Sequence, residues 1–342
     1  LEGHDRHAVL ISVPGDGPSL EADLDRGVQV HRVWIRKRRV FIDLPRLAAL
    51  FRSIQPDVVH SHMFWCNLYG TLAARLAGVP AVFTTEHGEN RWKRPWHRWA
   101  EARVISPLAD KRFCVSPQIL ESRRDQDGVP EGKLRVVANG VPLPDLGERD
   151  TSAVPLIGSV GRFVVQKALP DLVEAAAVLR GWGLEFRLVL VGDGPDRAAV
   201  EAAVSRLGLE DIVELPGFER NVGDYLKRLS IFASSSIEEG QPLALLEAMA
   251  WGLPCVVTGV GAVPRTLTDV MEGRIVRPSR PEEIAAAIRE YLSDPELATR
   301  TGLAARRRVE RDFSSAAVAA RHLEAYTQCL SNKGRAISEC TP

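Results

Sequence analysis

The stretch Ser236-Ile237-Glu238-Glu239-Gly240-Gln241-Pro242-Leu243-Ala244-Leu245-Leu246-Glu247-Ala248-Met249-Ala250 carries two acids, Glu239 and Glu247, eight positions apart. Proline suits the first turn of a helix and residues 243–250 are strong helix formers, so a helix is predicted from Pro242, with Glu239 in the preceding loop. At about 1.5 Å per residue, Glu247 is expected roughly 10 Å beyond Glu239. That distance is at or beyond the upper end of the roughly 5 to 9.5 Å between paired glycosidase carboxylates, which argues against joint attack on one carbon. Two such acids suit the ends of a long hydroxylated ligand whose anionic middle meets the helix N-terminus, and a nucleotide sugar has that shape.

Around this stretch, short apolar runs alternate with helical patterns, which is typical of parallel sheets flanked by helices. In the first half, the predicted strands are His7–Val13, Val28–Ile35, Asp57–Ser61, Ala81–Thr85, Arg112–Val115 and Leu134–Val137. The predicted helices there are Leu44–Arg52, Asn67–Ala77, Pro95–Ile105 and Pro117–Asp125. The alternation restarts at Leu156, and three helical stretches follow between Pro281 and Leu330.

The chain of 342 residues is longer than one core usually serves, so two domains are expected. A proline-rich polar linker is predicted over 142–152. We therefore expect an α/β protein with two doubly wound, Rossmann-like domains facing a cleft, over 1–147 and 152–312. The helix at 313–330 is expected to pack back on the first domain, and 331–342 to be a disordered tail.

Composition excludes several classes of protein. The five cysteines are odd in number, widely spaced and without a C-x-x-C pair, which argues against a disulfide framework or a zinc site and favours the reducing cytosol. No apolar run approaches the ~18 residues that cross a bilayer, and the first residues lack a signal pattern.

A local excess of basic residues marks the first half, with 16 basic against 6 acidic residues between positions 26 and 112. Tryptophans are interleaved with basic residues over 91–99, a combination that suits an anionic membrane surface. A solvated helix whose tryptophans pack inward explains the same pattern equally well. Nucleic-acid binding is disfavoured, because the charge is local and no recognition motif accompanies it.

A second polar motif opens the second domain, where Gly161 at a predicted strand end is followed by Arg162 and Lys167. Two cations across a turn can clamp a diphosphate, with the guanidinium as a fork and the ammonium as a point charge. Alone, this motif is weak, and a solvated lysine at a helix start explains it as well.

The combination of Gly161-Arg162…Lys167, Gly192-Asp193-Gly194-Pro195 and Glu239-x7-Glu247 followed by Ala248-Met249-Ala250-x-Gly252-x-Pro254 resembles the retaining nucleotide-sugar glycosyltransferases of the GT-B fold, family GT4. The first half is similar through Asp57-Val58-Val59-His60-Ser61-His62, Thr85-Glu86-His87-Gly88 and Asn139-Gly140-Val141. The resemblance covers residues 1–328.

The resemblance implies that Arg162 and Lys167 neutralise the donor diphosphate and that Glu247 binds the ribose hydroxyls. The amides from Gly240 to Leu243 would meet the phosphates at the helix start. Donor-binding residues would then be Gly161, Arg162, Lys167, Gly240, Gln241, Pro242, Leu243 and Glu247.

Two residues are expected to act on the reacting groups. By the resemblance, Glu239 contacts the transferred sugar, and His87 faces the sugar or the acceptor from the carboxyl end of a first-domain strand. His60 and His62 have the spacing of a metal pair, but no third ligand is evident and the family uses no essential metal. We expect both to pack and form hydrogen bonds at a strand end, and Asp193 to satisfy turn amides.

The sequence departs from the family pattern at several points. The usual opening strand and glycine-rich loop do not precede Leu1-Glu2-Gly3-His4, so a fragment or a compromised first domain is expected. Gln241 replaces a frequent aromatic or aliphatic residue, and Ala168 replaces a glycine, a minor change unless positive φ is needed. Arg265 stands where an acid often follows Pro264.

The leading functional hypothesis is a cytoplasmic, metal-independent retaining glycosyltransferase in bacterial surface-polysaccharide or glycolipid assembly, peripheral on the inner face of the membrane. Its partners would be a UDP- or GDP-sugar donor and a lipid-linked or saccharide acceptor. Two alternatives are a nucleotide-sugar-binding module without turnover and a GT-B-like sugar-nucleotide epimerase.

Overall fold

The computed structural model describes residues 6–12, 27–34, 40–88, 93–147 and 154–335. The chain divides into unit 1, which comprises residues 1–137 and 319–342, and unit 2, which comprises residues 138–318. Residues 142–147 of the predicted linker lie within unit 2. One reason is that Val141 N donates to Phe313 O over 2.9 Å, which ties this segment to unit 2.

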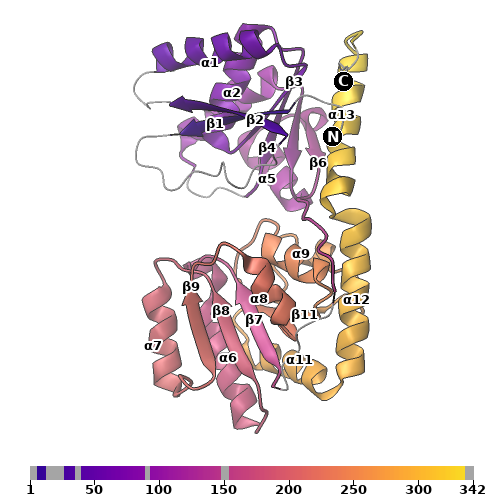
Figure 1. Ribbon diagram of the computed structural model, residues 1–342. Coiled ribbons are helices and arrows are strands. Elements are labelled where there is room, and N and C mark those ends of the chain that lie inside the picture. Colours follow the sequence, from indigo (N-terminus) through magenta and orange to yellow (C-terminus); the bar gives the residue numbers. More distant parts are fainter. Residues whose placement is uncertain (1–5, 13–26, 35–39, 89–92, 148–153, 336–342) are drawn as a thin grey trace. The chain divides into compact units, whose positions relative to one another are not determined.

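Unit 1 contains parallel strands in two groups within its described residues (Figure 1). One group pairs β1 (Arg6–Ser12) with β2 (Val28–Trp34). The other follows the order β3-β4-β5-β6 and consists of β3 (Val58–His62), β4 (Ala81–Glu86), β5 (Lys111–Cys114) and β6 (Leu134–Val136). The predicted strands are confirmed to within about one residue at each end, except that the predicted ends Val13 and Ile35 lie outside the described residues.

The helices of unit 1 also agree with the predictions. They are α1 (Val40–Ile54), α2 (Phe64–Ala77), α3 (Pro95–Ala100), the π-helical turn Glu101–Ile105, α4 (Ser106–Leu108) and α5 (Pro117–Asp127). β4 is buried along its whole length, so its last residue, Glu86, lies in the interior. The expectation of an absent opening strand stays a prediction.

The last helix, α13 (Ser315–Ser331), belongs to unit 1 from Ala319 onward. The Tyr326 hydroxyl lies 2.5 Å from His60 Nδ1. The predicted tail is in contact at its start, because Lys333 Nζ donates to Asp110 Oδ1 over 2.5 Å. Positions 336–342 lie outside the described residues.

Unit 2 is built on a fully parallel sheet with the order β12-β11-β10-β7-β8-β9 (Figure 1). Its strands are β7 (Leu156–Val160), β8 (Arg187–Val191), β9 (Val213–Gly217), β10 (Ile231–Ser234), β11 (Cys255–Thr258) and β12 (Arg274–Val276). Its helices are α6 (Leu169–Gly181), α7 (Arg197–Leu207), α8 (Val222–Arg228), α9 (Leu243–Ala250), α10 (Val263–Thr266), α11 (Pro281–Ser293) and α12 (Pro295–Asp312).

Successive side chains of the buried strands in unit 2 belong to two hydrophobic cores, one on each face of the sheet. Leu188 and Leu190 belong to a core with residues of α6, α7 and α11, whereas Val189 and Val191 belong to a core with residues of α8, α9 and α12. Successive strand side chains point to opposite faces, so a continuous apolar run is what a sheet covered on both faces requires. No helix within the described part of the chain is both long and apolar enough to cross a membrane.

Candidate functional site

The polar residues singled out in unit 2 gather at the carboxyl ends of β7 and β10, which are neighbours in the sheet. From β7 the chain continues to β8 and β9 on one side, and from β10 it continues to β11 and β12 on the other. Such a switch in strand order leaves a crevice at the strand ends, where α/β proteins bind ligands. The turn with Lys167 follows β7 and the loop with Glu239 follows β10, so the two predicted clusters meet there.

The turn after β7 is held against the end of β8. Gly161 N donates to Val191 O over 3.0 Å. At Gly192, φ is 140° and an added Cβ would lie only 1.9 Å from Gly161 O, so this close approach requires glycine. Asp193 Oδ1 accepts from Gly194 N over 2.7 Å, which confirms the structural role predicted for this acid.

Ala168 adopts a left-handed conformation with φ 43° and ψ 43° directly after the short 3₁₀ turn Val165–Lys167. Ala168 therefore has the positive φ at which replacing the usual glycine matters, because a Cβ disfavours positive φ. The Arg162 side chain is exposed, and Lys167 is half-buried. The two predicted cations thus follow the same strand end but differ in how far their side chains are exposed to solvent.

Lys167 and Glu239 form an ion pair across the switch point, with Lys167 Nζ 2.5 Å from Glu239 Oε1. The side chains are 22% and 13% exposed, so the pair is partly desolvated. The Ser236 hydroxyl donates to the same oxygen over 2.8 Å. The predicted phosphate cation and the predicted sugar-contacting acid are therefore in direct contact.

The helix predicted beyond this loop is α9, and Pro242 stands at its N-cap position. Gly240 O accepts from Ala262 N over 2.9 Å, so the loop before α9 rests on the segment after β11. Gln241 is buried, and its Oε1 accepts from Asn139 N over 2.6 Å. The Gln241 amide thus fixes the start of unit 2 against this loop, a contact that the donor assignment did not anticipate.

Glu247 lies in the middle of α9 and is half-buried. Burial raises the pKa of its carboxyl group above the ordinary value. Hydroxyl groups that donate hydrogen bonds to such a carboxylate stabilise its charged form. The ribose role assigned by the resemblance therefore fits the electrostatics of this position.

In unit 1, His87 follows the end of β4 and contacts His62, with Nδ1 of His62 3.0 Å from Nε2 of His87. The His60 ring stacks on His62 with centroids 4.4 Å apart, and His60 Nε2 lies 2.6 Å from Thr85 Oγ1. Burial, together with neighbouring histidines, holds the pKa of His60 well below its usual value. The predicted packing and hydrogen bonding of His60 and His62 are confirmed.

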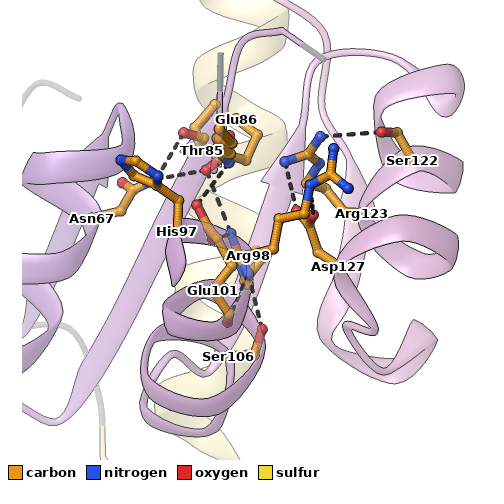
Figure 2. A network of polar contacts seen from close by, with 12 residues as sticks. Asn67, Thr85, Glu86, His97, Arg98, Glu101, Ser106, Ser122, Arg123 and Asp127 are labelled. Carbon is orange, nitrogen blue, oxygen red and sulfur yellow. Dashed lines mark hydrogen bonds and ion pairs between the residues drawn. The ribbon is translucent and has the colours of Figure 1, made fainter. Parts of the chain in front are cut away.

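A buried ion network lies next to His87, at the end of β4 (Figure 2). Lys93 Nζ lies 3.2 Å from Glu86 Oε2 and 2.8 Å from Glu101 Oε1. The Arg112 guanidinium contacts both acids as well. Burial and then Glu101 raise the pKa of Glu86, whereas Arg112 and Lys93 lower that of Glu101 against the effect of burial.

The same network continues to α5, where Arg123 Nη1 lies 2.6 Å from Asp127 Oδ2 and both side chains are buried. Figure 2 shows this pair beside Glu101 and Arg98. Buried charges need partners, and this network supplies them from β4, β5, α5 and the segment around α3. These contacts hold the Lys93 side chain in the interior.

Sequence reasoning missed three contributors to these sites. Ser236, Asn139 and Glu86 lie within motifs that it quoted, but none was given a role. A signal existed only for Glu86, an acid directly after a predicted strand that carries no other charged residue. In the described ranges, no group of three or more His, Cys, Asp or Glu side chains is arranged to hold a metal ion.

The chain matches two protein families that together span most of its length. Residues 2–144 match Glycosyltransferase Family 4, and residues 149–308 match Glycosyl transferases group 1. The 2-deoxystreptamine glucosyltransferase of Streptomyces kanamyceticus is 28% identical over 305 residues, covering 81% of this chain and 78% of its own. The UDP-Gal:alpha-D-GlcNAc-diphosphoundecaprenol alpha-1,3-galactosyltransferase of Escherichia coli is 27% identical over 258 residues, covering 68% and 66%.

Solved structures share the fold. A glycosyltransferase from Rickettsia africae superposes with a TM-score of 0.83 at 19% identity, covering 97% of this chain and all of its own. Anabaena HepE in complex with UDP-glucose superposes with a TM-score of 0.76 at 16% identity, covering 94% and 99%. The expected two-domain GT-B fold is confirmed.

Proposed function

Because the chain belongs to the GT-B glycosyltransferases, with a Glycosyltransferase Family 4 domain followed by a glycosyl transferases group 1 domain, we propose that it is a retaining glycosyltransferase. In this proposal a sugar moves from a UDP- or GDP-sugar to an acceptor hydroxyl during surface-polysaccharide or glycolipid assembly. The observation that carries the proposal is the contact between Lys167 and Glu239 at the switch point of unit 2. A diphosphate needs a cation and sugar hydroxyls need an acceptor, and Lys167 after β7 and Glu239 before α9 supply these two groups side by side.

The proposed mechanism depends on the charges that develop as the donor bond breaks. Departure of the nucleoside diphosphate leaves negative charge on its phosphate oxygens while the sugar carbon becomes oxocarbenium-like. Lys167, Arg162 and the amides at the start of α9 would stabilise the departing phosphate, a preorganised effect that usually dominates such catalysis. Retention would follow from attack of the acceptor on the face that the diphosphate leaves, with a phosphate oxygen taking the acceptor proton. Side-chain cations would supply the charge, so the proposal includes no essential metal.

Named relatives support the choice of substrates. HepE was solved with UDP-glucose, and the Escherichia coli relative is named for a UDP-Gal donor and an alpha-D-GlcNAc-diphosphoundecaprenol acceptor. We extend both classes to this chain: a nucleoside-diphosphate sugar donor and a lipid-linked or saccharide acceptor. His87 is assigned a contact with the sugar or the acceptor.

The test is an assay of the purified chain with UDP- and GDP-sugars, with and without EDTA. Transfer, or slow donor hydrolysis, with the anomeric configuration kept and with activity unchanged by EDTA would support the proposal. Donor binding without turnover would indicate a binding module instead. Sugar interconversion without release of nucleotide would indicate an epimerase.

We also propose that the chain acts at the cytoplasmic face of an anionic membrane through the helical stretch that begins at Pro95. Trp96 is 45% exposed and Trp99 is 61% exposed, and Arg98 and Arg103 are exposed around them. Exposed tryptophans beside arginines suit the interface of anionic lipids. Residues 91 and 92 of the predicted patch lie outside the described residues.

Liposome flotation tests this surface. The wild-type chain should float with vesicles containing phosphatidylglycerol, and the double variant Trp96→Ala/Trp99→Ala should lose most of that binding. Trp182→Ala is the matched control, since Trp182 is a 43% exposed tryptophan of unit 2. Equal flotation of the double variant and the control would refute the surface.

A further inference from the structure

Among the residues that the structure describes, side-chain donors hold the carboxylate of Glu239 through one of its two oxygens. Lys167 Nζ lies 2.5 Å from Oε1, and the Ser236 hydroxyl donates to the same Oε1 over 2.8 Å. One donor carries a charge on a flexible stem, and the other is a short neutral side chain. These two donors respond differently when a ligand enters the site.

Ser236 is fixed on both sides of its own position. It is 1% exposed, and its hydroxyl lies 3.1 Å from the Ser234 hydroxyl. Its carbonyl accepts from Thr258 Oγ1 over 2.5 Å, and the next amide, Ile237 N, donates to Gln166 O over 2.8 Å. The Ser236 hydroxyl therefore keeps its place relative to β11 and to the turn after β7.

Lys167 is free to exchange partners. An ammonium on a four-carbon stem is a mobile point charge, and a diphosphate competes strongly for it. The cavity lined by Lys167, Ser236 and Glu239 has a volume of about 10 Å³, room for about one water molecule. A diphosphate does not fit in this cavity, so a donor phosphate that binds Lys167 competes with Glu239 for its ammonium.

We infer that Ser236 is a positioning residue that keeps Glu239 in place after the donor diphosphate has drawn Lys167 away. This inference rests on the proposed function. With Ser236 holding Oε1, the second oxygen of Glu239 is directed to a hydroxyl of the transferred sugar. Ser236 thus acts on the sugar end of the donor and contributes little to binding of the diphosphate itself.

The test compares Ser236→Ala with the wild-type chain, using a nucleoside diphosphate and the corresponding nucleotide sugar. We expect the affinity for the nucleoside diphosphate to stay within about twofold. We expect kcat/KM for transfer to fall roughly 10- to 100-fold, the range for losing a hydrogen bond to a charged group. Ser236→Thr, which restores the hydroxyl, should recover part of this loss.

Ser314→Ala is the matched control, because Ser314 is another buried serine of unit 2, and its hydroxyl bonds to backbone groups of Glu310 and Ala317. Its kcat/KM should be unchanged. Parallel loss of nucleoside-diphosphate affinity and kcat/KM in Ser236→Ala would indicate a merely structural role and overturn the inference. An unchanged kcat/KM would overturn it as well.

Glu239→Gln tests the competition for Lys167. A neutral amide no longer pairs with the ammonium, so this variant should bind the nucleoside diphosphate several-fold more tightly while transfer falls. Unchanged or weaker binding would contradict the exchange of partners. A wild-type chain that binds neither nucleotide would refute the proposed function itself, whereas wild-type transfer with an unaffected Ser236→Ala variant would refute only the role of Ser236.

Discussion

At the residue scale, Ala168 places a Cβ in the left-handed region, with φ 43°, at the boundary between the turn of Lys167 and α6. We predict that Ala168→Gly raises the free energy of unfolding of unit 2 by about 0.5 to 1 kcal/mol. The relief of the Cβ penalty, about 1 to 2 kcal/mol, exceeds the greater freedom of glycine in the unfolded chain. Urea unfolding measures the change, and Ala199→Gly, inside α7, should instead lower stability by about 1 kcal/mol.

Glu247 provides a second prediction at this scale. Removal of its carboxylate in Glu247→Ala should abolish detectable binding of the nucleoside diphosphate, because the ribose hydroxyls lose their acceptor. Since burial raises the pKa of Glu247, the substitution also removes a desolvated charge and should leave the folded state as stable as before or more so. Isothermal titration and thermal unfolding separate the two effects, and unchanged affinity would refute the ribose role.

The sequence allowed the elements that carry these residues to be predicted, but not the partners of their side chains. Strand ends and the start of α9 follow from apolar runs, glycine and proline, which act locally. Lys167 and Glu239 are 72 positions apart, and Asn139 and Gln241 are 102 apart. The contact between Lys167 and Glu239 depends on β7 and β10 being neighbours in the sheet, and local sequence patterns do not encode which strands are neighbours.

At the element scale, the buried ion network joins β4, β5 and the π-helical turn Glu101–Ile105 through Lys93 and Arg112. Lys93 was expected on a basic solvated or membrane-facing surface, yet its side chain is only 1% exposed between Glu86 and Glu101. Glu86 and Glu101 lie only seven and eight positions from Lys93 in the sequence, but the local pattern does not show that the fold brings both acids to its ammonium. Lys93 therefore does not belong to the basic surface predicted over 91–99.

Lys93→Ala should destabilise unit 1 by about 3 to 5 kcal/mol, because it leaves two buried acids with too little positive charge. The loss should be smaller at pH 5 than at pH 8, since the pKa of Glu86 is already raised and would rise further without Lys93. Denaturant unfolding at the two pH values provides the measurement. Lys111→Ala, at an exposed position of the same unit, should cost less than about 1 kcal/mol at both. A pH-independent loss in Lys93→Ala would contradict this account of Glu86.

At the scale of the whole molecule, the two units carry different chemical groups and should respond to different agents. A nucleoside diphosphate at 100 times its dissociation constant should stabilise unit 2 by ~2.7 kcal/mol, because it binds the folded state alone. Acid should act on unit 1, where the pKa of His62 is lowered to about 4 and that of His60 also lies below its usual value. Below about pH 6.5 these histidines become protonated in the unfolded chain but stay neutral in the folded state, because their pKa is lowered there.

The free energy of unfolding of unit 1 should therefore have its full value above about pH 6.5 and fall by on the order of 1 to 3 kcal/mol toward pH 4.5, a range that allows for solvent screening at the exposed His62. Hydrogen exchange followed by mass spectrometry can assign the loss, since peptides of β3 and β4 report on unit 1 and peptides of β7 and β10 on unit 2. His60→Gln removes one of the titrating groups, so its stability should change less with pH even if it is lower at pH 7. An acid response of equal size in both units, or an unchanged slope in His60→Gln, would show that the acid sensitivity does not arise from these histidines.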